Sequence, residues 1–389
     1  MKKYLSLLWP LYLSWFFWGV SFFFIPIWIL FFQSRGLDLA EIGFVMSGTY
    51  LASVLLEYPT GIFADKYGRK LSLLLASVIY IISLLVDVTA YSTVQFFIGA
   101  FLMGASWAFT SGAKEAIIYD TLKEKKLEKF NSKVLGSLDT IGAVGGIVAA
   151  LIGSLVFRIN ETLPYWLSIG TSVLAFMFLF WIKEPKYKED GQIIEVYKQF
   201  KEGLKLALRN PVLLSLFLLC IPLFFFEEAW YNAHQPILVG LGLPVIMLGT
   251  YQAVKTILMA IGGIALPKLL DKLNHKVLLI TIVFLEAGTW IMLGTDKLYI
   301  VIIFSYVLLL IHLLWNYVDA DIIHDHISSH VRATTLSARQ MLISIIWIFN
   351  PWFMGYLMNN FSRTFLFPIF GLIVLLLAMT LFLSRKKYF

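Results

Sequence analysis

Glu227, Glu228 and Lys255 lie inside long apolar segments, where ionisable side chains are rare. A charge at the centre of a membrane-spanning helix costs about 2.5–3.5 kcal/mol on insertion scales, so such residues usually pair or serve a function. A carboxylate–ammonium pair between neighbouring helices would satisfy Lys255 and one of the two carboxylates. Adjacent residues point about 100° apart around a helix. We therefore expect the other carboxylate to face an interior cavity, where burial suits it to carry a proton.

A second set of charges lies near one end of the apolar segments; its members are Glu57, Lys114, Glu115, Asp139, Asp319 and Arg339. We expect Lys114 to pair with Glu57 or with Asp139. Arg339 is expected to pair with Asp319. Glu57 is the preferred second proton site, because the residues around it are apolar, and Glu115 is a further candidate. The alternative is an ion-pair network that performs no proton transfer.

These charges must be positioned by membrane-spanning helices. The chain has 389 residues, of which 59% are hydrophobic and 14% charged, a composition that excludes a soluble globule. Apolar segments of about 20 residues recur from end to end, each long enough to cross a bilayer as a helix. The sequence therefore predicts an all-α membrane protein. We expect twelve spans, at residues 8–32, 41–63, 71–90, 94–120, 133–157, 164–182, 211–233, 245–267, 277–295, 298–323, 334–358 and 364–383.

The net charge of +7 is distributed as a topology signal rather than as a nucleic-acid patch. With the N-terminus in the cytoplasm, all but seven of the 31 Lys and Arg residues fall on cytoplasmic segments. This asymmetry predicts a multi-pass protein of the cell (inner) membrane, with both termini cytoplasmic. The short loops are typical of a prokaryotic protein. The longest polar stretch, 183–210, has an amphipathic pattern and is expected to link two halves, 1–182 and 211–389.

The two halves repeat at a nearly constant offset. Residues 61–70 place Asp65 ahead of basic residues in a short gap between apolar segments, and a weaker copy follows 206 residues later, at 267–276. Six spans separate the copies, so both have the same orientation, and the repeat axis is expected to run along the membrane normal. Two further pairs keep the same order: residues 36–43 with 242–249, and residues 116–120 with 321–325.

Twelve spans, a parallel repeat of six, and the glycine, acidic and basic residues of 61–70 resemble the major facilitator superfamily. The segment 332–337, at the start of span 11, also resembles that family's drug-efflux branches. The glycines of the family's antiporter motif in span 5 are only partly matched here, by Gly142, Gly145 and Gly146. The resemblance implies two pseudo-symmetric six-helix bundles that alternate in exposing one central site.

The resemblance also implies a conformational gate at the motif loop. Asp65 would face the N-terminal end of span 11, and Arg69 would reach Asp120. Gly61 and Gly68 would allow close helix approach and a tight turn. The remaining members of the predicted gate are Lys70, Asp271, His275, Lys276 and Asp325.

In the second copy of the loop, His275 replaces Arg69. A pair between His275 and Asp325 is expected to be weaker than the pair in the first loop and sensitive to pH. The alternative for both loops is that their charges only set the topology.

The spans that line the substrate path in this family are rich in aromatic residues here. Flat or cationic organic molecules bind such surfaces by stacking and cation–π contacts. Few amides that would suit a sugar lie at the centre of these spans, which favours an amphipathic substrate. The predicted cavity residues are Trp15, Trp18, Phe22, Trp107, Phe224, Trp230, Lys255, Trp315, Asn316 and Tyr317.

We therefore expect a secondary transporter, monomeric in the lipid bilayer, that exports small amphipathic or cationic compounds in exchange for protons. An uptake symporter or facilitator of a small metabolite is the alternative within the same fold. A receptor or lipid-modifying protein without transport activity is a third hypothesis. No phosphate-binding loop, dinucleotide fingerprint or catalytic triad order is present. We accordingly predict no enzyme activity, no cofactor, no metal site and no nucleic-acid partner, with the energy supplied by an ion gradient.

Overall fold

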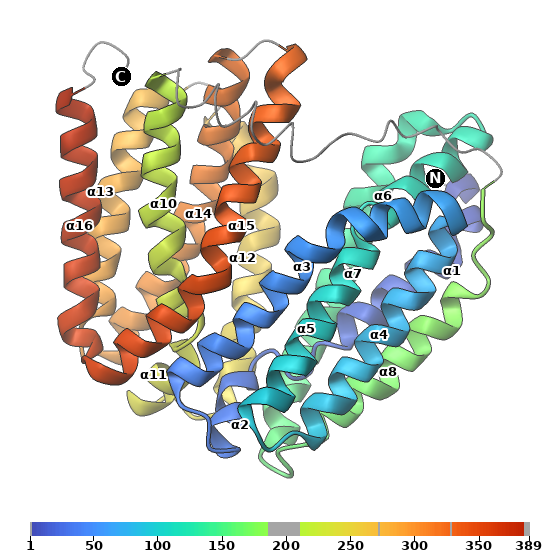
Figure 1. Ribbon diagram of the computed structural model, residues 1–389, viewed down its shortest axis with the longest axis horizontal. Coiled ribbons are helices and arrows are strands. Elements are labelled where there is room, and N and C mark those ends of the chain that lie inside the picture. Colours follow the sequence, from blue (N-terminus) through green and yellow to red (C-terminus); the bar gives the residue numbers. More distant parts are fainter. Residues whose placement is uncertain (1, 186–210, 271–272, 327–328, 385–389) are drawn as a thin grey trace. The chain divides into compact units, whose positions relative to one another are not determined.

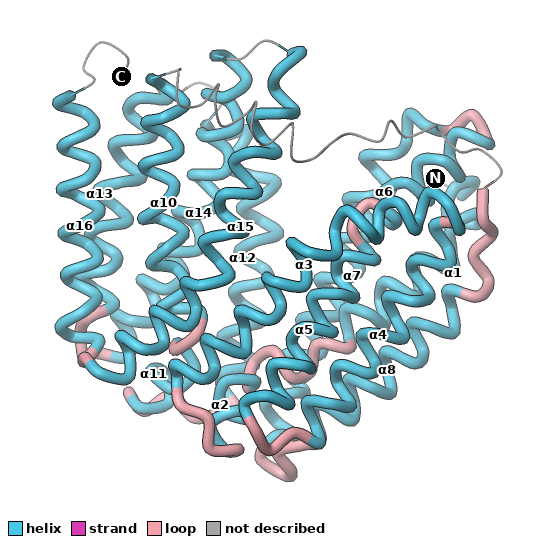
Figure 2. Tube along the Cα trace, in the orientation of Figure 1, coloured by secondary structure: helices cyan, strands magenta, loops and turns pink. Residues whose placement is uncertain are grey.

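The computed structural model describes residues 2–185, 211–270, 273–326 and 329–384, and this part of the chain is helical, without strands (Figures 1 and 2). Its helices in the first half are α1 (Lys2–Val20), α2 (Trp28–Ser34), α3 (Leu39–Tyr67), α4 (Arg69–Thr89), α5 (Thr93–Thr110), α6 (Ala113–Glu124), a short 3-10 helix (Glu128–Phe130), α7 (Asn131–Phe157) and α8 (Leu163–Leu179). In the second half they are α10 (Pro211–Tyr231), α11 (His234–Gly240), α12 (Met247–Leu270), α13 (His275–Leu293), α14 (Leu298–His326), α15 (Ser329–Asn360) and α16 (Arg363–Ser384).

The described residues fall into two compact units. Those of the first unit come from the ranges Met1–Leu37, Phe44–Ile193 and Pro244–Thr256. Those of the second come from Asp38–Gly43, Ile194–Leu243 and Ile257–Phe389. The first turns of α3 thus belong to the second unit and its remainder to the first, whereas the first turns of α12 belong to the first unit and its remainder to the second. The domain boundaries expected from the sequence, at 182 and 211, stay a prediction.

The two units pack their helices in the same pattern. In the first, α4 lies against α5 and α8, and α1 lies against α7 and α8. In the second, α13 lies against α14 and α16, and α10 lies against α15 and α16. Each pair in one unit has its counterpart in the other, which is the internal arrangement that a duplicated six-helix bundle requires.

Two spans that were predicted as continuous, 8–32 and 94–120, are interrupted, and a turn at the end of the span 211–233 leads into a further short helix, which corrects the expected boundaries. Turns replace the helix at residues 21–27, 111–112 and 232–233. In the first break Pro26 has no backbone N–H to donate. In the second, Gly112 adopts a φ of 69°, a conformation that few other residues tolerate. Long spans are consequently built as two helices in series, α1–α2, α5–α6 and α10–α11.

The short helices α2 and α11 confirm the repeat in detail. Each has seven residues, and they begin at Trp28 and His234, 206 residues apart. Each is followed by a glycine in the left-handed region, Gly36 with φ 91° and Gly242 with φ 99°. Only glycine adopts this conformation without strain, which explains why this landmark recurs in the sequence.

A second pair of repeated glycines permits close backbone contact. A Cβ added to Gly43 would overlap the carbonyl oxygen of Pro351 on α15, within the second unit. A Cβ added to Gly249 would overlap the carbonyl oxygen of Ala150 on α7, within the first unit. The glycines at this offset therefore occupy equivalent helix crossings.

Six described helices are long and apolar enough to cross a membrane by length and composition, and two shorter apolar helices accompany them. Large apolar side chains on these helices are exposed, among them Leu376 at 63%. Exposure of this kind is unfavourable in water and is expected of side chains that face lipid.

Candidate functional site: ionisable clusters and aromatic surfaces

The motif loop forms the predicted contact between Arg69 and Asp120. The Arg69 Nε atom lies 3.3 Å from Asp120 Oδ2, and both side chains are buried. Arg69 Nη2 also lies 3.5 Å from the more exposed carboxylate of Asp65. One guanidinium therefore joins the end of α3, the start of α4 and α6 through two carboxylates. The predicted contact of Asp65 with span 11 stays a prediction.

The glycines of this loop play different roles. Gly68 has a φ of 112° and forms the sharp turn between α3 and α4, as predicted. Gly61 was expected to permit close helix approach, but a Cβ added there would meet no described atom within 4 Å. The expected role of Gly61 in close helix approach therefore stays a prediction. In the second loop, Asp271 and the side chains of His275, Lys276 and Asp325 lie outside the described residues.

Glu184 is a member of the motif loop that the sequence did not reveal. Its two carboxylate oxygens accept hydrogen bonds from the backbone N–H groups of Arg69, at 2.8 Å, and Lys70, at 2.7 Å. The Lys70 ammonium in turn donates to the carbonyl oxygen of Phe180 at 2.7 Å. A carboxylate at a helix N-terminus satisfies amide groups that have no partner within the helix. Glu184 thus caps α4 from a position 115 residues away in sequence.

Lys114 pairs with Asp139, one of the two partners expected for it. The ammonium lies 2.8 Å from Asp139 Oδ1 and 4.6 Å from the centroid of the Trp15 ring. The Lys114 side chain is largely covered, with 13% exposed, whereas Asp139 is 65% exposed. A carboxylate and an aromatic face therefore enclose a cation in the first unit.

Trp15 begins a run of aromatic contacts along the first span. Its ring lies 5.3 Å from that of Trp18, and Trp18 makes an edge-to-face contact with Phe22 at 4.7 Å. Phe22 in turn contacts Tyr80 of α4. Trp107 is exposed on α5. The predicted aromatic residues of spans 1 and 4 are thus present as one continuous series and one separate exposed ring.

A small cavity of about 30 Å³ lies behind this series, among α1, α4, α5 and α8. Hydroxyl groups from all four helices, including those of Ser14, Tyr80 and Ser106, line it beside the two indoles. Its volume suits a single water molecule rather than a substrate. The expected substrate contact of Trp15 and Trp18 stays a prediction.

The second unit gathers ionisable side chains from three helices. Glu227 of α10 places Oε1 3.3 Å from Nδ1 of His312 on α14. The other ring nitrogen, Nε2, lies 3.4 Å from the carbonyl oxygen of Leu223. Glu286 of α13 is completely buried and accepts a hydrogen bond from Trp290 Nε1 at 2.8 Å. Glu286 thus lies on a helix that packs against α14, the helix that carries His312.

The sequence did not reveal this cluster as a unit. His312 was not among the predicted residues, because a single histidine in an apolar segment gives no pattern. Glu286 was not among the predicted site residues either, and the partner expected for Lys255 was one of Glu227 and Glu228. The signal that could have predicted the cluster is that His312 lies at a similar depth in the membrane to Glu227 and Glu286, which are on other predicted spans of the same half.

The neighbouring Glu228 takes a different environment. It is buried, and Asn232 Nδ2 donates to its Oε2 at 3.3 Å. Lys255 is half-buried on the part of α12 that belongs to the first unit. Its predicted pairing with Glu227 or Glu228 stays a prediction.

The other predicted cavity residues of the second unit differ in exposure. Trp315 is completely buried and Trp230 nearly so, which is typical of residues that pack the interior. Phe224 stacks on the His312 ring with a centroid distance of 5.6 Å. Asn316 is exposed and Tyr317 is half-buried. Phe224 is therefore the predicted aromatic residue that lies directly against the ionisable cluster.

The secondary proton sites proposed from the sequence are not buried. Glu57 on α3 and Glu115 on α6 are both exposed in this conformation. The apolar sequence around Glu57, which motivated its choice, therefore does not cover its side chain here, and its role as a proton site stays a prediction. The side chains of Asp319 and Arg339 lie outside the described residues, so their predicted pairing stays a prediction.

Asp87 on α4 is a buried carboxyl group that the sequence analysis overlooked. It is 3% exposed, and its Oδ1 has no hydrogen-bond partner among the described residues. A Cβ on Gly99 of α5 would overlap this oxygen, so Gly99 makes room for the carboxyl group.

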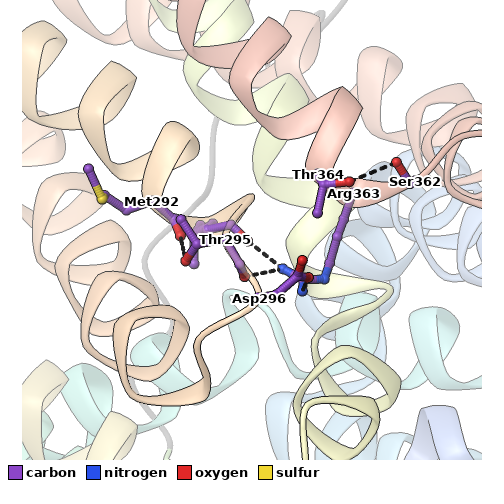
Figure 3. Close-up of polar contacts among 7 residues, drawn as sticks. Met292, Thr295, Asp296, Ser362, Arg363 and Thr364 are labelled. Atoms are coloured by element: carbon purple, nitrogen blue, oxygen red, sulfur yellow. Dashed lines mark hydrogen bonds and ion pairs between the residues drawn. The ribbon is translucent and has the colours of Figure 1, made fainter.

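Arg363, the first residue of α16, makes polar contacts with the turn between α13 and α14 (Figure 3). Arg363 donates from Nη1 to the carbonyl oxygens of Leu293, at 3.0 Å, and Thr295, at 2.6 Å. Its Nη2 donates to Asp296 Oδ1 at 2.6 Å. One side chain at the start of α16 therefore fixes the turn between α13 and α14, which is a structural role.

The ionisable cluster has an uncharged counterpart in the first unit. At the repeat offset of 206, Glu227, Glu286 and His312 correspond to Ser21, Tyr80 and Ser106. Ser21 Oγ donates to the Tyr80 hydroxyl at 3.4 Å, and Tyr80 and Ser106 line the same small cavity. Equivalent helices thus bring together hydroxyl groups in one unit and two carboxyl groups with an imidazole in the other.

Comparison with known proteins agrees with this architecture. The model of the Major Facilitator Superfamily matches residues 11–320. An uncharacterised MFS-type transporter of Bacillus subtilis is 27% identical over 234 residues, which cover 58% of this chain and 57% of the relative. This match spans less than two thirds of the relative's length.

Two solved structures show the same fold. The nucleoside transporter NupG superposes with a TM-score of 0.77 and 15% identity, over 100% of both chains. A D-xylose–proton symporter superposes with a TM-score of 0.71 and 14% identity, over 96% of this chain and 97% of the other. The duplicated helical units and the match to the family over most of the chain lead to one conclusion. The chain belongs to the Major Facilitator Superfamily and is a transport protein rather than an enzyme.

Proposed function

We propose that this protein is a proton-coupled secondary transporter that exports small amphipathic or cationic organic compounds by alternating access. The substrate class is supported by the position of the Lys114 ammonium between the Trp15 ring and the Asp139 carboxylate, a binding position named the Lys114 seat below. An arrangement that holds an internal ammonium is chemically suited to hold an organic cation, because an aromatic face and a carboxylate attract both. An incoming cation would compete with Lys114 for this seat.

The aromatic series supports the same substrate class. Trp15, Trp18 and Phe22 offer large apolar faces next to the Lys114 seat. Stacking against such rings contributes about 0.5–1.5 kcal/mol per contact beyond the burial of area, without requiring a particular pattern of hydrogen bonds. A series of this kind favours flat, amphipathic molecules over sugars.

Proton coupling is supported by the ionisable side chains within the second unit. Glu227 and His312 lie at ion-pair distance, and Glu286 is buried on α13, which packs against the helix of His312. Ionisable groups inside membrane-spanning bundles are expensive and commonly mark proton or ion pathways. One structural relative is a D-xylose–proton symporter, so the fold is compatible with proton coupling.

The test is transport by the purified full-length protein in proteoliposomes with an imposed pH gradient, using ethidium as a fluorescent organic cation. We expect ethidium to move against the direction of proton flow, and its movement to stop when a protonophore dissipates the gradient. Transport in the direction of proton flow would instead identify an uptake symporter. Absence of transport for ethidium and for a panel of amphipathic cations would refute the proposed substrate class.

A further inference from the structure

We propose that Glu227, His312 and Glu286 together form the proton-binding site of this transporter, with Glu227 as its accessible member and Glu286 as its buried member. The inference rests on the proposed function and names the site of coupling within it. Three observations support it: the distance of 3.3 Å between Glu227 and His312, the burial of His312 and Glu286, and the graded exposure across the cluster.

The hydrogen-bond geometry of His312 requires a proton between its ring and Glu227. Nε2 faces the carbonyl oxygen of Leu223, which only accepts hydrogen bonds, so Nε2 carries a hydrogen. In a neutral ring Nδ1 would then present a lone pair to the Glu227 carboxylate oxygen at 3.3 Å. Two electron-rich atoms at this distance repel each other. One added proton, on Nδ1 or on the Glu227 carboxyl group, turns this repulsion into attraction.

Glu286 provides the second protonation site. Its Oε1 accepts a hydrogen bond from Trp290, but Oε2 has no hydrogen-bond partner among the described residues. The side chain is completely buried, on a helix that packs against the helix of His312. A buried carboxylate without a full set of partners is strongly disfavoured relative to the neutral acid.

The charge balance of the cluster follows directly. With both carboxyl groups ionised and the imidazole neutral, the three residues carry a charge of −2. One proton shared by Glu227 and His312 and a second proton on Glu286 bring the total charge of the three residues to zero. The packed, dry arrangement therefore favours the loaded state. A conformation that admits water to the cluster would stabilise the charged state and release protons.

The helices α10, α15 and α16 carry further polar and aromatic side chains of the second unit. On α10, Glu228 is held by Asn232, and the charges of Glu227 and Glu228 both act on Tyr231. From α15, Asn350 is uncharged and donates to the carbonyl oxygen of Phe225. On α16, the side chains packed against Glu286's neighbour Trp290 are Phe367 and Phe370. Among these groups, His312 is the one that becomes a cation when it takes up a proton.

Accessibility is graded across the three residues. The side chain of Glu227 is 38% exposed and that of His312 is 7% exposed, whereas Glu286 is completely buried. A proton that enters from solvent meets Glu227 first. Phe224, which stacks on the imidazole, separates the ring from its surroundings on one face. A substrate that displaces Phe224 would hydrate His312 and so link substrate binding to proton release.

The experiment is infrared spectroscopy of the purified full-length protein in lipid, which detects the C=O stretching band of a protonated carboxyl group during pH titration. We expect Glu286→Gln to remove one such band at neutral pH, and Glu227→Gln to shift the pH at which a second band disappears. His312→Gln should shift the titration of both bands. Spectra of the three variants that titrate like the wild type would overturn the proposal.

Two controls separate titration from misfolding. Glu286→Gln keeps an oxygen that accepts from Trp290 Nε1, so it removes the ionisable group with little change in shape. Tyr80→Phe changes the equivalent position of the first unit, and Glu128→Gln removes an exposed carboxylate. Both controls should retain the wild-type bands. If Glu286→Gln fails to fold, the His312→Gln spectra decide the question through the titration of the remaining Glu286 band.

The titration and the transport assay test the proton-binding site and the proposed function separately. The titration requires no substrate, so loss of the bands in these variants would support the site even if ethidium is not transported. If the wild type drives ethidium export with a pH gradient, the variants should exchange ethidium but fail to accumulate it. Gradient-driven accumulation by all three variants at the wild-type rate would overturn the site while the proposed function stands.

Discussion

The same three positions carry hydroxyl groups in the first unit and ionisable groups in the second. Tyr80 and Ser106 line a cavity the size of one water molecule, and Ser21 donates a hydrogen bond to the Tyr80 hydroxyl. Their counterparts Glu227, Glu286 and His312 hold charges that depend on one another. The helices around both trios pack in the same pattern, although Ser21 lies in the turn after α1 whereas Glu227 lies within α10, so the chemical difference comes from the side chains.

This contrast indicates a division of labour between copies of one structural unit. Hydroxyl groups satisfy their hydrogen bonds in every protonation state of the protein, so the first trio is indifferent to pH. Carboxyl and imidazole groups change charge, so the second trio couples structure to proton concentration. We infer that proton coupling belongs to the second unit and that the cation seat at Lys114 belongs to the first.

The largest loss of stability is expected when a carboxyl group is introduced into the first unit at the position equivalent to Glu286. Tyr80→Glu would bury a carboxyl group where no cation of the described residues compensates it. We expect destabilisation of about 3 kcal/mol, measured as a lower midpoint of thermal unfolding in detergent. Adding Ser106→His would rebuild the second unit's trio in the first and should recover part of the loss. A single variant as stable as the wild type would show that the two environments are more alike than their side chains indicate.

A smaller effect, equal in both copies, is expected at the repeated glycines. Gly43→Ala and Gly249→Ala each place a methyl group against a backbone carbonyl that cannot move aside easily. We expect each to cost about 2 kcal/mol of stability, since overpacking of this kind typically costs 1–3 kcal/mol. Gly61→Ala, where no described atom is near, serves as the control. Unequal losses would break the equivalence of the two helix crossings.

Within the second unit, the two adjacent glutamates should separate in function. Glu227→Gln removes a member of the proton-binding cluster, and we expect at least a tenfold loss of pH-driven transport, about 1.4 kcal/mol in barrier height. Glu228→Gln preserves a hydrogen-bonding partner for Asn232 and should reduce the same rate by less than threefold. Initial rates of gradient-driven ethidium export measure both. A larger loss from Glu228→Gln would assign the proton to the other glutamate.

In the first unit, removal of the internal cation should strengthen binding rather than weaken it. Lys114→Met leaves the Trp15 face and the Asp139 carboxylate available to an external cation. Because cation–π contacts contribute about 0.5–2 kcal/mol, we expect ethidium to bind roughly threefold to tenfold more tightly, measured by fluorescence anisotropy. Lys125→Met, an exposed change, provides the control. Weaker binding in Lys114→Met would indicate that the lysine itself contacts the substrate.

Several features of the site could be predicted from the sequence because they depend on local spacing. The pair of Arg69 with Asp120 follows from a charged loop and an acidic residue at the end of a span. The pair of Lys114 with Asp139 follows from two charges at the same depth of neighbouring spans. The repeat itself was visible as glycines and charges at one offset, and the left-handed conformations of Gly36 and Gly242 give the physical reason.

Other features depend on contacts that no local pattern encodes. His312 reaches Glu227 across 85 positions in the chain, and Glu184 caps α4 from more than a hundred residues away. Asp87 was overlooked because a single carboxyl group in an apolar helix resembles a chance substitution until Gly99 is seen to accommodate it. The exposed position of Glu57 was missed because an apolar neighbourhood in sequence does not reveal which face of a helix is covered.

The matched left-handed glycines after α2 and α11 have a consequence for the mutational behaviour of the whole chain. If each copy imposes the same backbone demands, a saturation mutagenesis map should correlate with itself at a shift of 206 positions. The correlation should be strong where glycine conformation or helix crossing is at stake, and should fail at the three positions that exchange hydroxyl groups for titratable ones. Tolerance data would then locate functional divergence between the copies without any knowledge of the transported molecule.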